Sequence, residues 1–206
     1  MSIIFTHGTM LSGKSMRLID VYLKNQDSYK IAILKPITDD RNGMYIHTRF
    51  GSTDEGTRVK CHMWKPSQTL ASALTSINDG IPTDEYDIII IDEAQFLNKK
   101  QVMEINDMSC AYDEDDPDKD NPLEFFLYGL KNTFKGDLFE GAAHILAIAD
   151  ETVELSKRCW CRKPAKQNAK VKNGEVVKDG DIEDVGYHYV PLCNKHYHMG
   201  MLQKKK

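Results

Sequence analysis

The sequence predicts an α/β fold in which helices cover a mostly parallel sheet, followed by a smaller C-terminal region. Three observations predict it. Short β-rich runs alternate with helix-length segments, which is typical of βαβ units. Four consecutive isoleucines, residues 88–91, suit a strand that is covered on both faces. From Cys159 onward this pattern stops, and a segment rich in lysine, asparagine, glycine and aspartate runs to Gly186.

The alternation can be followed along the chain from its first residues. Strands are predicted where short runs are rich in β-branched and aromatic residues, namely 3–6, 30–34, 86–91 and 123–128. Helices are predicted for longer segments between these runs, namely 15–25, 67–77 and 99–109. In the first of these helices, apolar residues recur at the spacing of one helix face. Strands separated by helices in this way indicate a doubly wound core.

Two polar stretches interrupt the pattern. Residues 38–56 contain glycine and predict a mobile loop. Residues 113–121 hold six carboxylates with one lysine and one proline. A run of like charges is typical of a solvated surface segment, so we expect a loop there and not a metal site.

Length and composition limit the classes of protein to consider. At 206 residues the chain can bury a proper core, and the usual domain size predicts one domain, or one with a small appendage. Formal net charge is −4 and the pI is near 6.0. Proteins that hold nucleic acid need clustered lysine and arginine, so this balance argues against that class. The basic cluster at residues 204–206 is expected to be a solvated end.

We expect neither a membrane-spanning segment nor a signal peptide in this sequence. No apolar run approaches the ~18 residues of a membrane span. Residues 2–6 are too short for the apolar core of a signal peptide, so we expect a cytoplasmic protein. The five cysteines are an odd number for a disulfide framework in a reducing compartment, which makes metal ligation the reading to test. Cys61 and Cys110 have no nearby partner in the sequence and are treated as ordinary residues.

A phosphate-binding loop follows the first strand. Residues 8–15 match G-x-x-x-x-G-K-[ST] at every fixed position and open a helix. The glycines allow backbone angles that a Cβ would forbid, so amide N–H groups can converge on phosphate oxygens. The lysine is expected to reach the β- and γ-phosphates, and the final hydroxyl to hold Mg²⁺. The sequence therefore predicts a nucleoside triphosphate site formed by Gly8, Thr9, Met10, Leu11, Ser12, Gly13, Lys14 and Ser15.

A pair of carboxylates, Asp92 and Glu93, follows the isoleucine strand directly. An aspartate at the end of a buried strand beside a phosphate loop is typical of a residue that positions Mg²⁺. Glu93 can face the γ-phosphate, where an attacking oxygen would stand. Two chemistries use such a glutamate: in an ATPase it orients water, and in a kinase it takes the proton from an alcohol.

Two short pairs of metal-ligating residues are separated by residues 162–192. Such pairs usually hold a structural Zn²⁺, because each lies on a tight turn that directs its side chains at one point. His198 is an alternative to the predicted histidine, and free thiols in a small core are the alternative to a metal site. A closed metal site would fix both ends of the intervening loop, which suggests a lid over a substrate. The predicted ligands are Cys159, Cys161, Cys193 and His196.

On these residues the chain resembles the thymidine kinases of the zinc-containing, P-loop type found in bacteria, phages, poxviruses and animal cytosol. The resemblance covers nearly the whole chain, and the bacterial and phage branch is the most similar because its zinc site has the same Cys₃His pattern. Further matching motifs are Lys35-Pro36 with Asp39 and Arg41, Asp92-Glu93-Ala94-Gln95-Phe96, Tyr128-Gly129-Leu130 with Phe134, and Leu138-Phe139-Glu140-Gly141 leading to Ala147-Ile148-Ala149-Asp150. The resemblance implies a P-loop NTPase (RecA-like) domain over residues 1–150, and a small zinc-binding lasso domain over residues 151–206.

The resemblance also implies an activity: transfer of the γ-phosphate of ATP to the 5′-hydroxyl of thymidine, and of deoxyuridine, giving dTMP in nucleotide salvage. Glu93 would be the general base, with Lys14 and Arg41 near the transferring phosphate. Asp92 would serve ATP·Mg²⁺, and Gln95 is assigned to the nucleotide site.

In the family, the loop between the zinc pairs is a lasso that grips thymine largely through backbone hydrogen bonds. By position, the nucleoside pocket would include Met10, Phe96, Phe134, Asn168 and Tyr189. The resemblance further implies feedback inhibition by dTTP and a homo-oligomer, a tetramer or a dimer, with no nucleic-acid or membrane partner.

The chain departs from the family pattern at a few positions. Residues 131–133 replace a more usual aspartate, and Asn168 and Lys170 replace a threonine and an arginine; these changes affect base recognition and not the chemistry.

Two rival functions are also considered. The motif of residues 92–95 also occurs in nucleic-acid-dependent ATPases, but such motors need two tandem cores. A non-catalytic zinc module with a degenerate nucleotide site is the third reading, against which the intact Lys14 and Glu93 argue.

Overall fold

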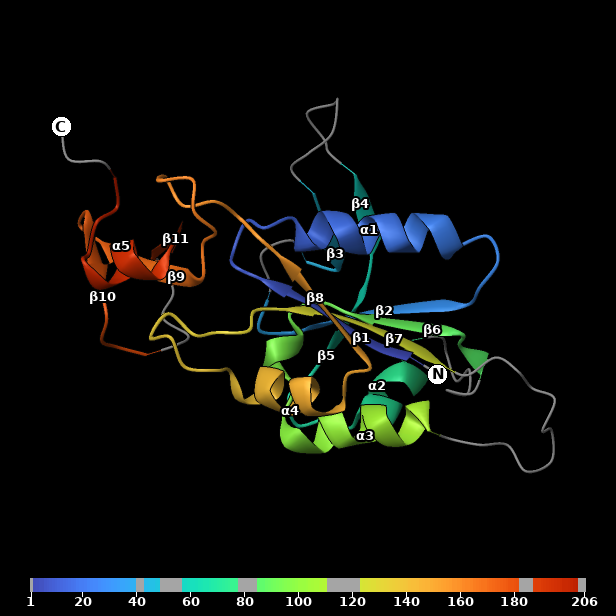
Figure 1. Cartoon of the computed structure of the whole chain (residues 1–206). Coiled ribbons are helices and arrows are strands. Elements are labelled where there is room, and N and C mark those ends of the chain that lie inside the picture. The colour runs from blue at the N-terminus through green and yellow to red at the C-terminus, as the bar shows by residue number, and fades with distance from the viewer. Residues whose placement is uncertain are drawn as a thin grey trace.

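A six-stranded sheet forms the centre of the molecule (Figure 1). The computed structural model describes residues 2–39, 43–48, 57–77, 85–110, 123–181 and 187–203. The strand order is β5-β2-β6-β7-β1-β8, and all neighbouring strands run parallel. The strands are β1 Ser2–Gly8, β2 Ile31–Pro36, β5 His62–Trp64, β6 Ile88–Ile91, β7 Glu124–Gly129 and β8 Glu151–Leu155. The predicted α/β fold with a mostly parallel sheet is confirmed.

Helices cover both faces of this sheet (Figure 1). One face carries α1, and the other carries α2, α3 and α4. The bounds are α1 Lys14–Asn25, α2 Leu70–Thr75, α3 Lys99–Ser109 and α4 Glu140–Ile148. Because successive side chains of a strand point to opposite faces, the isoleucine strand contributes to two cores. Ile89 and Ile91 lie in the core beneath α3 and α4, whereas Ile88 and Ile90 lie in the core beneath α1.

Capping residues account for where two helices begin. Asn98 and Gln101 form a reciprocal capping box, so α3 starts at the predicted residue. The hydroxyl of Thr69 accepts from the N–H of Ser72 at 3.1 Å, which places the start of α2 three residues after the predicted one. A 3₁₀ turn, η2 Ala94–Phe96, follows β6 and links it to α3.

The predicted loop over residues 38–56 contains a strand in its described part. β3, Tyr45–His47, pairs antiparallel with β4, Arg58–Lys60. The stretch 113–121 and the predicted site residue Arg41 lie outside the described residues. None of the described helices is both long and apolar enough to cross a membrane.

The C-terminal unit, residues 156–203, holds a second and smaller sheet beside the carboxyl ends of β1 and β8 (Figure 1). Its antiparallel strand order is β10-β9-β11, and its short helix α5 carries one predicted metal ligand. The bounds are β9 Gln167–Lys172, β10 Glu175–Val177, β11 His188–Leu192 and α5 Asn194–His198. The chain enters this unit directly from β8, and the division into two domains at residue 150 stays a prediction.

Candidate active site at the carboxyl edge of the sheet

The phosphate loop has a backbone that only particular residues allow. Gly13 precedes α1 with φ 93° and ψ 16°, in the left-handed region, and gives the helix no side-chain cap. Leu11 also has a positive φ, 61°, although it is not glycine. At Gly8, a Cβ would lie 2.6 Å from the Ser12 hydroxyl oxygen and would also collide with the backbone of Leu155. The predicted glycine requirement of the loop is therefore present in its geometry.

The polar groups of this loop are positioned for an anion. The hydroxyls of Thr9 and Ser12 are buried, and neither has a hydrogen-bond partner among the described residues. The Lys14 ammonium donates to the carbonyl oxygens of Thr9 at 3.0 Å and Gly8 at 3.5 Å. The uncapped first turn of α1 adds N–H groups and the positive end of the helix dipole. Orphaned hydroxyls, a cation and a helix N-terminus together suit a triphosphate.

Asp92 lies next to this loop, at the end of β6. Its side chain is buried, and its Oδ1 accepts from the N–H of Glu93 at 3.0 Å. Burial, together with the neighbouring charge of Glu93, raises the pKa of Asp92 to about 7. The backbone hydrogen bond and the Lys14 ammonium act in the opposite direction. Burial disfavours the charged form of this carboxylate, and a bound divalent cation would compensate that charge. Asp92 therefore fits a ligand for such a cation.

Glu93 occupies a tight turn between β6 and η2. Its backbone is left-handed, with φ 51° and ψ 39°, which is uncommon for a residue with a side chain. Gln95 donates from Nε2 to its carboxylate at 2.6 Å and accepts from the N–H of Leu130 at 2.9 Å. The carboxylate is therefore held in place from a neighbouring strand end. Strained backbone of this kind concentrates at functional sites.

The phosphate loop is also connected to the C-terminal unit. The N–H of Met10 donates to Oδ1 of Asn168, on β9, at 2.7 Å, and Asn168 is 4% exposed. The structure thus brings together two residues predicted for the nucleoside pocket. Tyr189 lies on β11, half-buried. Phe96 is half-buried and packs edge to face against Phe139, with ring centroids 6.0 Å apart.

A buried lysine lies beside Phe134. The sequence did not predict this contact. Lys170 is fully buried, and its ammonium is 4.6 Å from the ring centre of Phe134 and 4.0 Å from that of Tyr187. It also donates to the carbonyl of Asp181 at 3.0 Å. Cation–π contacts of this length stabilise a desolvated ammonium. The side chain connects the strand of the C-terminal unit to a phenylalanine of the preceding segment.

The four predicted zinc ligands come together in the C-terminal unit. Their ligand atoms all lie within 4.8 Å of one another. Nδ1 of His196 is 3.3 Å from Cys159 Sγ and 3.4 Å from Cys193 Sγ, and Cys161 Sγ is 3.8 Å from Cys193 Sγ. Donors bound tetrahedrally to one Zn²⁺ lie about 3.4–3.8 Å apart. Both the chemistry and the spacing of this donor set therefore fit zinc.

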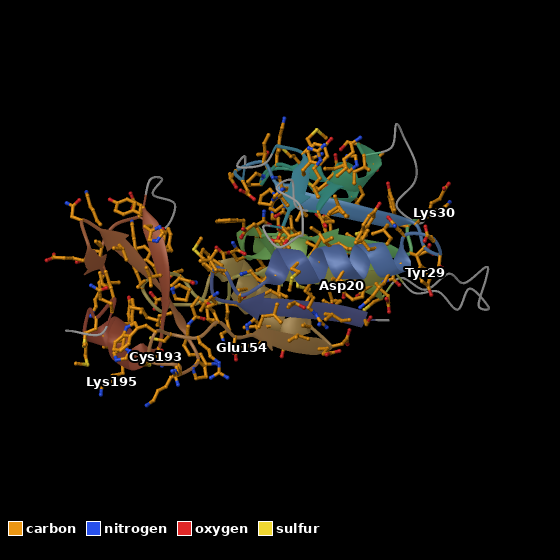
Figure 2. The ribbon with its side chains drawn as sticks, turned by 90° about the horizontal axis from the view of Figure 1, so that it is seen from above. Asp20, Tyr29, Lys30, Glu154, Cys193 and Lys195 are labelled. Carbon is orange, nitrogen blue, oxygen red and sulfur yellow. The ribbon has the colours of Figure 1, made fainter. Side chains whose placement is uncertain are left out.

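Two further contacts fix this cluster to its surroundings. The ring of Trp160 stacks on that of His196, with centroids 4.0 Å apart and an interplanar angle of 18°. Lys166 forms an ion pair with Glu154 of β8 at 2.6 Å, where the C-terminal unit meets the sheet. Figure 2 shows Cys193 and Lys195 in the C-terminal unit, and Glu154 between this unit and the rest of the molecule.

Known proteins are similar to this chain over nearly its full length. The family model described as "Thymidine kinase" matches residues 1–197. A thymidine kinase of Lactiplantibacillus plantarum is 32% identical over 202 residues, covering 95% of this chain and 94% of that protein. A thymidine kinase of Lactococcus lactis is 31% identical over 198 residues, covering 94% of this chain and 95% of that protein.

A solved structure gives a weaker match. Bacteroides Pif1 bound to single-stranded DNA aligns with a TM-score of 0.41 and 16% identity, over 76% of this chain and 38% of that one. Similarity at this level establishes neither a shared function nor a shared ligand.

Proposed function

The chain belongs to the thymidine kinase family, and from that premise we propose how its residues divide the work of phosphorylating thymidine with ATP. The observation that carries the proposal is the meeting, at one edge of the parallel sheet, of an anion-binding loop with the carboxylates of Asp92 and Glu93. Ligands bind at the carboxyl ends of the strands in open α/β sheets, which supports this location.

The phosphate loop would hold the triphosphate of ATP. Its backbone N–H groups surround the phosphates, the Thr9 and Ser12 hydroxyls gain the partners they lack, and Lys14 exchanges its carbonyl acceptors for phosphate oxygens. Ser15 and Asp92 would hold Mg²⁺. The ion would supply positive charge that offsets the negative charge of the transferring phosphoryl group. We assign Arg41 to the same charge, as the resemblance implies.

Glu93 would act as the general base. Its carboxylate accepts the proton of the 5′-hydroxyl while that oxygen forms a bond to the γ-phosphorus, and the bond to the β-phosphate oxygen breaks to release ADP. The turn that follows β6 fixes the glutamate one residue beyond Asp92, so metal ligand and base have separate positions. This separation supports two different roles for the two acids.

The nucleoside would bind between the phosphate loop and the C-terminal unit. The hydrogen bond from Met10 to Asn168 supports this, because it joins the two parts of the chain at that point. The pocket proposed from the resemblance consists of Met10, Phe96, Phe134, Asn168 and Tyr189. A zinc ion held by Cys159, Cys161, Cys193 and His196 would fix the ends of the lasso.

Several finer properties of the family are also proposed for this chain. They are acceptance of deoxyuridine, inhibition by dTTP, assembly into a dimer or tetramer, a cytoplasmic location, and a kinase domain over residues 1–150 with a lasso domain over residues 151–206.

The Glu93→Gln variant tests the proposed base. Removing the proton acceptor should lower kcat about 10²-fold or more, while ATP affinity stays within about twofold, because phosphate contacts are unchanged. Steady-state kinetics with thymidine and calorimetric ATP binding would measure the two effects. Near-normal turnover would remove Glu93 as the base.

Product analysis with each nucleoside tests the substrate. Labelled ATP should yield a monophosphate with thymidine, and ATP turnover should rise with thymidine and not with single-stranded DNA. Stimulation by DNA alone would contradict the assignment.

A further inference from the structure

We propose that Gln95 is a positioning residue that orients the carboxylate of Glu93 before substrate binds. The inference rests on the proposed role of Glu93 as general base. Gln95 is 3% exposed, and both ends of its side-chain amide are hydrogen-bonded within the protein. Its buried side chain is therefore placed to hold another side chain, and the nucleotide contact predicted for Gln95 stays a prediction.

The orientation of the Gln95 amide follows from its partners. The backbone N–H of Leu130 can only donate, so the amide atom 2.9 Å from it is the oxygen. The amide nitrogen then faces Glu93 and donates to Oε2 at 2.6 Å. Rotating the amide by half a turn would set donor against donor and acceptor against acceptor. The two hydrogen bonds thus fix each other.

The surrounding elements are shaped to admit this side chain. At Gly129, the last residue of β7, a Cβ would lie 2.7 Å from Gln95 Oε1 and 3.1 Å from its backbone nitrogen. At Gly141, in the first turn of α4, a Cβ would lie 2.6 Å from the carbonyl oxygen of Gln95. Two glycines therefore allow a strand end and a helix start to close on one glutamine. Such close packing restricts its rotamers.

This arrangement has a direct consequence for Glu93. Fixing one carboxylate oxygen fixes the plane of the group, and so the direction from which its other oxygen accepts a proton. A base that is already oriented saves the entropy of ordering it in the transition state.

Gln95→Glu tests the proposal, because the variant keeps an oxygen for the Leu130 N–H and loses the donor to Glu93. We expect kcat to fall about tenfold or more, with KM for ATP within about twofold. Gln95→Met, which removes both hydrogen bonds at similar length, should likewise lower kcat with KM for ATP within about twofold.

Gln101 provides a matched control. It is 2% exposed, its Oε1 accepts from the N–H of Asn98 at 3.0 Å, and its Nε2 donates to the carbonyl of Gln68 at 2.8 Å. Gln101→Glu loses the same type of donor in a capping box away from the carboxylates. It should lower the melting temperature and leave kcat unchanged.

The outcomes separate this inference from the proposed function. If Glu93→Gln is inactive while Gln95→Glu and Gln95→Met keep wild-type kcat, the positioning role is overturned and the base assignment stands. If Glu93→Gln retains full activity, both fail. In the double variant with Glu93→Gln, Gln95→Glu should cost no further activity; an additional tenfold loss would mean that Gln95 acts independently of Glu93.

Discussion

Among single residues near the site, His7 is a buried histidine that lies one position before the phosphate loop. It is 6% exposed, its Nδ1 has no hydrogen-bond partner among the described residues, and its ring is 5.3 Å from that of Phe5. Burial lowers the pKa of His7, and the positive charges of Lys131 and Lys166 lower it further, against the effect of Glu154. The folded protein therefore favours the neutral ring.

Because the pKa of His7 is lowered in the folded protein, the free energy of unfolding decreases as the pH falls. Above the unfolded pKa of about 6.5 the contribution of His7 is complete, and it is lost as the pH falls through the lower folded pKa. We expect the melting temperature of His7→Phe to fall less than that of the wild type between pH 7.5 and 5. Equal losses measured by scanning calorimetry would mean that other groups govern the acid response.

Sequence alone predicts the chemistry of residues but not their long-range partners. The phosphate loop and the Asp92-Glu93 pair are contiguous, so their residue types and spacing carry the prediction. The orientation of Gln95 depends on Leu130, 35 positions away. Lys170 lies on a strand where its charge would predict an exposed side chain, and its burial is accounted for by contacts with the rings of Phe134 and Tyr187 and with the carbonyl of Asp181.

At the scale of elements, β9 is tied to the phosphate loop through Asn168. Asn168→Ala would leave the Met10 N–H without its buried acceptor, at a cost of about 1–3 kcal/mol. Because the affected N–H belongs to the phosphate loop, we expect KM for ATP to rise about three- to tenfold, together with a lower melting temperature.

Asn194→Ala is the control for this change. Asn194 is an exposed amide of the same unit that accepts from Gln167 at 3.2 Å and, among the described residues, forms no hydrogen bond with the phosphate loop, so KM for ATP should not change. A wild-type KM in Asn168→Ala, with only the melting temperature reduced, would show that the connection is structural and not functional.

Element boundaries were predicted well where local signals exist and poorly where they do not. The capping box of Asn98 and Gln101 marks α3, and it begins where predicted. The helix α4 was not predicted from periodicity, because residues 140–148 are mostly apolar and the helix begins after Phe139, which supplies no side-chain cap. The three-residue β3 exists through its pairing with β4, which no local pattern indicates.

At the scale of the whole molecule, the main sheet and the C-terminal unit are stabilised differently. The isoleucine strand contributes to apolar cores on both faces of the sheet, which is why its burial could be predicted from composition. The C-terminal unit has a much smaller apolar core, centred on Ala169, Leu192 and Tyr197 together with two of the cysteines. Cores of that size usually need a metal or disulfide in addition.

This difference leads to a prediction about zinc. The purified protein should contain roughly one zinc per chain, since structural sites of this donor set bind tightly. Cys193→Ser should lower the metal content and increase amide hydrogen exchange in β9 and β11, because their unit loses its main cross-link. Exchange in β6 and β7 should change little, since their apolar cores do not depend on the metal.

Cys193→Ser should also weaken the binding of thymidine more than the binding of ATP. The lasso lies between the metal-ligand pairs, whereas most of the phosphate loop is fixed by β1 and α1, so we expect KM for thymidine to rise at least about tenfold and KM for ATP to change less. Cys110→Ser, which alters an exposed thiol outside the cluster, should behave as the wild type. Metal-free protein with unchanged exchange in the C-terminal unit would show that its small core suffices, and the zinc would then have no part in holding the nucleoside.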